Sequence, residues 1–220
     1  MRIFKLTSLA LLALSLTVTT VDALADDAPA EDAYAQIEMG NIGEFNPTWT
    51  KAKDIQETIT KWETQLNKLQ DDTKQAAGIA TDAPVQKAFD DMKETAGEML
   101  TVAIDGGQPK LTVDDAAPEN VKAFVATVDS GVGTCQGIID NAKEIPGEIE
   151  ALIEEAKGLP SQLTPSILKD NGLKAKDLKG EKATIANNTN ALKATKPRVE
   201  GVIETAVEFV NLVKGLTPAG

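Results

Sequence analysis

The feature that most constrains the fold is a stretch at residues 121–156 in which apolar side chains recur at steps of three or four residues. This spacing places apolar side chains on one narrow stripe of an α-helix, and a helix buries such a stripe against partner helices. We therefore predict a long, packed helical stretch here. Its stripe consists of Val121, Val125, Val128, Val132, Cys135, Ile139, Ala142, Ile145, Ile149, Leu152 and Ala156.

Three further stretches carry the same helical spacing, at residues 47–80, 85–103 and 178–216. The first keeps its stripe over about four heptads, which is typical of coiled-coil-like seams. The last is as long as residues 121–156, and we expect these two to pack antiparallel. The sequence therefore predicts an all-α fold, an elongated antiparallel helical bundle with coiled-coil-like packing that forms a single domain over residues 47–216.

Prolines and loops divide this pattern. Proline lacks a backbone N–H and clashes with the preceding turn, so we expect kinks in the long helices near Pro146 and Pro197. Residues 105–117 are expected to form the longest internal loop. Within it, residues 111–113 could be extended, but one such piece does not make a sheet.

A cluster of small residues lies in the middle of the first stretch, at Gly131, Gly133 and Gly137. In an antiparallel hairpin this cluster falls roughly opposite residues 195–201, which include Pro197 and Gly201. Two interpretations stay open. The small residues admit a close helix crossing, or they form a hinge, since each glycine inside a helix costs about 1 kcal/mol relative to alanine.

The N-terminal residues have the pattern of a secretory signal peptide, expected at residues 1–25. Arg2 and Lys5 precede an uncharged apolar run, and Ala23-Leu24-Ala25 provides a small-x-small cleavage site. A membrane anchor is the alternative, but the run is short and broken by Ser and Thr. We expect an exported protein, periplasmic or extracellular, with a flexible acidic tail at residues 26–46 and a C-terminal tail at residues 217–220.

The chain is strongly acidic, with a formal net charge of −12 and no histidine. Loss of residues 1–25 would remove Arg2, Lys5 and Asp22 and leave a charge of −13. Such a surface repels phosphate backbones and anionic headgroups. We therefore expect no nucleic-acid partner and no direct binding to anionic membranes.

The missing residue types restrict the chemistry. Without histidine, Ser-His-Asp and Cys-His catalysis, histidine-ligated metals and the Glu-x-x-His motif of di-iron bundles are excluded. The single cysteine, Cys135, is interpreted either as a small buried hydrophobe or as the site of an intermolecular disulfide. Adjacent carboxylates are expected to be solvated surface, at 71–72, 90–91, 114–115 and 154–155, and only the loop pair 114–115 would suit weak calcium binding. We predict no catalytic, cofactor or metal site.

These observations favour a non-enzymatic structural or scaffolding protein that acts through protein–protein contacts or self-association. The alternative is a carrier or sequestering protein that holds an apolar, lipid-like ligand between helices, because Ala- and Val-rich stripes could part around one. A weaker alternative is a membrane-remodelling helical dimer.

Overall fold

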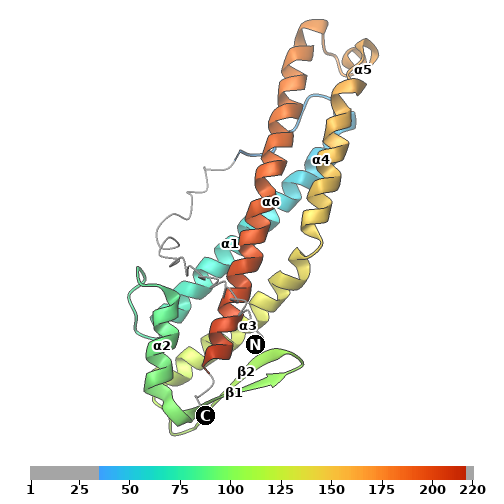
Figure 1. Ribbon diagram of the computed structural model, residues 1–220. Coiled ribbons are helices and arrows are strands. Elements are labelled where there is room, and N and C mark those ends of the chain that lie inside the picture. Colours follow the sequence, from blue (N-terminus) through green and yellow to red (C-terminus); the bar gives the residue numbers. More distant parts are fainter. Residues whose placement is uncertain (1–34, 217–220) are drawn as a thin grey trace, which may run out of the picture.

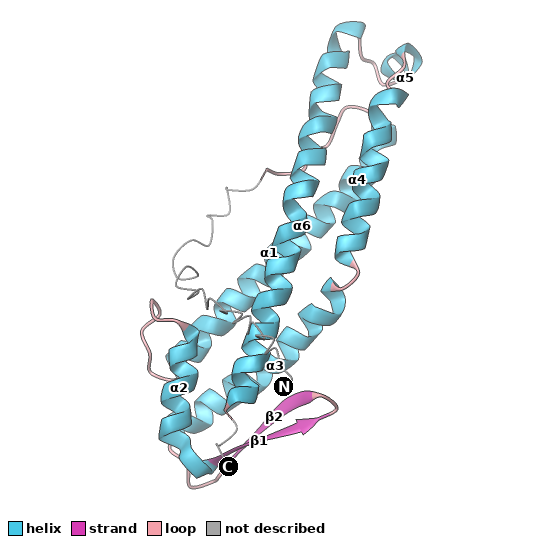
Figure 2. Cartoon of the chain, in the orientation of Figure 1, coloured by secondary structure: helices cyan, strands magenta, loops and turns pink. Residues whose placement is uncertain are grey.

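A computed structural model describes residues 35–216, and this part of the chain is mostly helical (Figures 1 and 2). The prediction of a predominantly helical chain is therefore confirmed, and the all-α expectation is confirmed only in part, because the described residues include one β-hairpin. The main elements in chain order are α1 (Asn46–Ala76), α2 (Val85–Ala96), β1 (Leu100–Asp105), β2 (Gln108–Val113), α3 (Glu119–Ala142), α4 (Ile145–Gln162), α5 (Pro165–Asp170) and α6 (Leu178–Gly215).

The 38-residue helix α6 is the longest helix described and contacts α1, α3 and α4. It packs against α3 over one half of its length and against α4 over the other, and it runs antiparallel to both (Figure 1). Helix α1 packs on α3 and α6 and also contacts α4. We refer to α1, α3, α4 and α6 together as the helical body.

The predicted stripes are largely the buried residues of the helical body. In α1, the stripe from Ala52 to Thr73 is buried. At the end of the body where α2 lies, the ring of Phe89 meets those of Phe124 and Phe209 edge to face, with centroids 5.4 and 5.5 Å apart. Edge-to-face packing suits the charge distribution of aromatic rings, so this cluster fixes α2 against α3 and α6.

The helix predicted over residues 85–103 ends at Ala96, and an antiparallel hairpin follows it. Gly97 has a φ of 49°, which terminates the helix. Gly106 and Gly107, with φ of 57° and 86°, form the two-residue turn between β1 and β2. A turn with both residues at positive φ matches the twist of paired strands, so the expected loop at 105–117 is partly a hairpin.

Near Pro146 the structure has a helix break in place of the predicted kink, whereas the kink at Pro197 stays a prediction. Helix α3 ends at Ala142 and α4 begins at Ile145. Pro146 lies in the first turn of α4, where its missing N–H has no helical acceptor anyway. Pro197, in contrast, lies inside α6, which continues through it.

The expected acidic tail at 26–46 is packed in the part that the structure describes. Ile37, Ile42 and Phe45 are buried, while Met39 is 48% exposed. Residues 35–42, here called the N-terminal strap, form no helix or strand and lie beside α1 and α6. The proposed signal peptide 1–25, the start of the tail at 26–34 and the C-terminal tail 217–220 lie outside the described residues.

Candidate interaction surfaces

A surface groove of about 560 Å³ lies between α1 and α4, beside the α3–α4 break. Ile55 and Leu152 are buried in its floor, and Ile145, the first residue of α4, is half-buried there. Helices α3 and α4 meet at this point and run in different directions (Figure 1). The groove is lined by Lys51, Asp54, Ile55, Thr58, Ile145, Glu148, Ala151, Leu152 and Glu155.

The rim of this groove is charged and predominantly acidic. Asp54, Glu148 and Glu155 contribute carboxylates, against a single ammonium from Lys51. Thr48 Oγ1 donates a 2.5 Å hydrogen bond to Glu155 Oε1, which orients that carboxylate. An apolar floor with an acidic rim suits an occupant that has apolar anchors and basic flanks.

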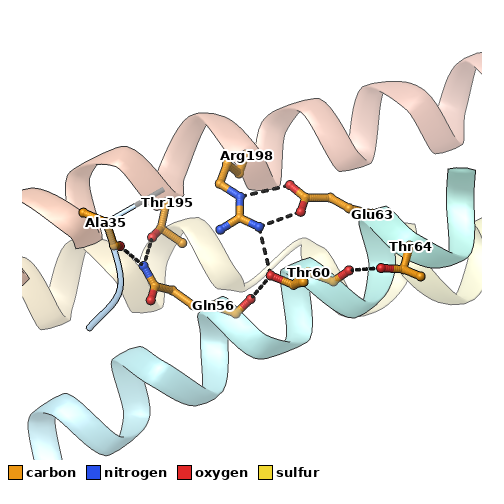
Figure 3. Close-up of polar contacts among 7 residues, drawn as sticks. All are labelled: Ala35, Gln56, Thr60, Glu63, Thr64, Thr195 and Arg198. Atoms are coloured by element: carbon orange, nitrogen blue, oxygen red, sulfur yellow. Dashed lines mark hydrogen bonds and ion pairs between the residues drawn. The ribbon is translucent and has the colours of Figure 1, made fainter. Parts of the chain in front are cut away.

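A buried polar seam holds the N-terminal strap against α1 and α6 (Figure 3). Gln56 accepts from the Ile37 N–H at 3.1 Å and donates to Ala35 O at 3.2 Å and to Thr195 Oγ1 at 3.1 Å. Asn188, which is fully buried on α6, forms hydrogen bonds with the next residue of the strap, Glu38. Its Oδ1 accepts from Glu38 N at 3.0 Å and its Nδ2 donates to Glu38 O at 2.7 Å.

An ion pair joins the same two helices further along (Figure 3). Arg198 Nε and Nη2 lie 3.0 and 2.5 Å from the two carboxylate oxygens of Glu63, and Nη2 donates to Thr60 Oγ1 at 3.0 Å. The Arg198 side chain is 8% exposed and that of Glu63 is 32% exposed. Two-point contact of a guanidinium with a carboxylate fixes the register between α1 and α6.

The hairpin presents one covered edge and one open edge. Strand β2 packs on α3, and the Leu111 N–H points toward Asp129 Oδ1 at 3.5 Å. On β1, Ile104 is 60% exposed. Within residues 35–216, nothing outside the hairpin forms a hydrogen bond with the main chain of Val102 or Ile104.

The structure separates the residues predicted to form a helix crossing or hinge. A Cβ on Gly131 would lie 2.5 Å from Leu69 Cδ1 and 3.0 Å from Phe209 Cε1, so α1 and α6 approach α3 closely at this glycine. Gly133, Gly137 and Gly201 are exposed, and a Cβ on any of them would meet no atom within 4 Å. Gly131 therefore lies opposite Phe209 rather than residues 195–201, and the exposed Pro197 is not its neighbour.

Cys135 is fully buried on the inner face of α3. Burial raises the pKa of its thiol to about 12. Since the thiolate is the form that attacks disulfides, the folded protein keeps Cys135 in its unreactive form. An intermolecular disulfide at Cys135 would require this part of α3 to open first.

Some of the adjacent carboxylates contact lysines of their own helices. Asp72 meets Lys68 at 2.7 Å, and Asp71 meets Lys74 at 2.9 Å. Asp91 is paired in the same way with Lys87 at 2.8 Å. No group of three or more His, Cys, Asp or Glu side chains that could hold a metal ion occurs in the described part of the chain.

Sequence reasoning missed the hairpin and the polar seam. The signal for the hairpin was present, because Gly106-Gly107 separates two runs that contain β-branched residues. The seam had a weaker signal. On α6 the fully buried polar residue is Asn188, and its neighbour Thr189 is half-buried.

No protein-family model, curated protein or solved structure matches this chain. Within residues 35–216, no helix combines the length and apolar character needed to cross a membrane.

Proposed function

We propose that the protein is an exported, non-enzymatic scaffold, a helical bundle that acts through protein–protein contacts in the cell envelope or outside the cell. The observation that carries this proposal is the α1–α4 groove. Its apolar floor and acidic rim offer a site for an amphipathic segment of another protein with basic residues beside its apolar anchors. The signal-peptide pattern in the sequence of residues 1–25 supports the proposed location.

The test is a pair of arginine substitutions in the full chain. Ala151→Arg places a long side chain in the groove, whereas Ala186→Arg adds the same charge at an exposed position of α6. Each variant is cross-linked in its native host, and the products are identified by mass spectrometry. We expect a stoichiometric envelope or secreted partner with the unchanged protein and with Ala186→Arg, and its loss with Ala151→Arg. Equal recovery with both variants, or saturable substrate turnover by the purified protein, would contradict the proposal.

A second candidate is a carrier of an apolar ligand, and the floor formed by Ile55, Ile145 and Leu152 favours it. Protein purified without detergent would then contain lipid in stoichiometric amounts, and Ala151→Arg would reduce that amount while Ala186→Arg would not. A native mass spectrum of the bare chain alone would remove this candidate.

A further inference from the structure

The register of the hairpin determines which main-chain groups of β1 point outward. Asp105 and Gln108 flank the two-residue turn and form a hydrogen-bonded pair. Such pairs alternate along an antiparallel ladder, so Ala103 and Thr101 point their main-chain groups toward β2. The N–H and C=O groups of Val102 and Ile104 therefore point to the open side of β1.

The opposite edge of the hairpin cannot accept another strand in the same way. Pro109, the partner of Ile104, has no N–H. Leu111, the partner of Val102, directs its N–H to Asp129 of α3. Natural sheets protect edges with proline, lysine, bulges or covering elements. Strand β2 has Pro109, Lys110 and the cover of α3, whereas β1 has none of these.

We propose that β1 pairs antiparallel with β1 of a second copy of this chain, about a two-fold axis at Ala103. This places Val102 opposite Ile104 of the second copy, and both residues have outward main-chain groups. Each such pair exchanges both of its hydrogen bonds, so the outward groups satisfy one another. At the centre, the small Ala103 lies opposite Ala103 of the second copy, in a pair where the two strands approach most closely.

The side chains fit the same register. Val102 and Ile104 lie on one face of β1, so the pairing joins them with the same residues of the second copy and covers the exposed part of Ile104. The charges are also compatible. Asp105, the acidic residue of β1, lies opposite the neutral Thr101 of the second copy, and the two Asp105 carboxylates lie at opposite ends of the interface.

The expected complex is a closed, reversible dimer. Because the β2 edges are covered, a third copy has no strand to join, and the four-stranded sheet ends there. The contact is far smaller than the standard interface of about 1,600 Å², so we expect weak association. Since each chain carries a formal charge of −12, salt screens their repulsion and tightens the dimer. This surface is distinct from the α1–α4 groove, so failure of one proposal leaves the other intact.

The first test measures the monomer–dimer equilibrium of the full chain by sedimentation equilibrium at low and high salt. We expect a dissociation constant that decreases several-fold with salt.

Ile104→Pro removes an outward N–H without touching the β1–β2 ladder and should abolish the dimer, whereas Ile104→Thr keeps that N–H and should only weaken it. Unchanged circular dichroism of Ile104→Pro verifies that the fold is kept. A monomer at all concentrations, or a dimer that Ile104→Pro leaves intact, would overturn the proposal.

The second test checks the register by disulfide trapping. Ala103→Cys places two thiols across the two-fold axis, where the Cα atoms lie within bridging distance, and mild oxidation should give a covalent dimer. Thr112→Cys lies on the same face of the hairpin but on β2, and Asp105→Cys lies away from the axis. Neither should cross-link, and equal cross-linking of all three variants would contradict this pairing.

Discussion

At the scale of single residues, Asn188 satisfies two main-chain groups of the strap with one side chain. It is an asparagine at a fully buried position of α6, and its amide satisfies both the N–H and the C=O of Glu38. A buried polar group left without partners costs about 1–3 kcal/mol. Asn188 is therefore one of the side chains that hold the strap, together with Gln56, and hydrophobic periodicity does not single it out.

We expect Asn188→Ala to lower the free energy of unfolding by about 1–3 kcal/mol, because the strap either loses its partner or detaches into water. Amide hydrogen exchange at Ile37 and Glu38 should accelerate strongly. Asn187→Ala, at the exposed neighbouring position, is the matched control and should leave both measurements nearly unchanged. Similar effects of the two substitutions would show that the seam does not hold the strap.

The glycines of α3 should respond to alanine with opposite signs. At Gly131 a methyl group would collide with Leu69 and Phe209, and overpacking typically costs about 1–3 kcal/mol, although the flexible end of Leu69 relieves part of it. At Gly133 a methyl group meets only solvent, so Gly133→Ala should stabilise the helix by up to about 1 kcal/mol. Urea unfolding of the two variants measures the difference, and a stabilising Gly131→Ala would contradict the close crossing.

At the scale of elements, sequence periodicity predicted the long helices and much of their buried faces. It failed at the hairpin, because Met92, Ala96, Met99 and Ala103 keep a helical spacing across it. The backbone overrides that spacing at Gly97, whose positive φ ends the helix. The α1–α4 groove could not be predicted from the sequence either, because it depends on how α1 and α4 lie relative to each other at the α3–α4 break.

The two prolines test the difference between a helix start and a helix interior. Pro197 deprives the carbonyl four residues earlier of its N–H donor inside α6, so Pro197→Ala should raise the free energy of unfolding by about 1–3 kcal/mol. Pro146→Ala replaces a residue in the first turn of α4 and should change it by less than about 0.5 kcal/mol. Thermal and urea unfolding provide the comparison. Equal effects would imply that the two prolines occupy equivalent helical positions.

At the scale of the whole molecule, the absence of histidine determines the response to pH. No side chain has an ordinary pKa between about 5 and 8, so stability should be nearly flat in that window. In acid, hydrogen bonds from Lys143 and Gln136 lower the pKa of Asp140, and one from Lys196 lowers that of Glu150. The stabilisation from such carboxylates exists above their unfolded pKa and is lost as the pH falls through the folded one.

In alkali the decisive group is Cys135, because burial raises the pKa of its thiol from 9.0 to about 12. The folded state keeps the thiol neutral while the unfolded chain ionises, so the stabilisation is complete below pH 9 and is lost as the pH rises toward 12. This difference in pKa between the unfolded and folded states corresponds to about 4 kcal/mol at the upper end. Lysines also titrate there, so the informative quantity is the difference in free energy of unfolding between the unchanged protein and Cys135→Ala, measured under reducing conditions at each pH.

Cys135→Ala should be less stable at pH 7 because of the cavity it leaves, and this deficit should shrink between pH 9 and 12. A deficit that stays constant would mean that the thiol ionises as readily in the folded protein as in the unfolded chain.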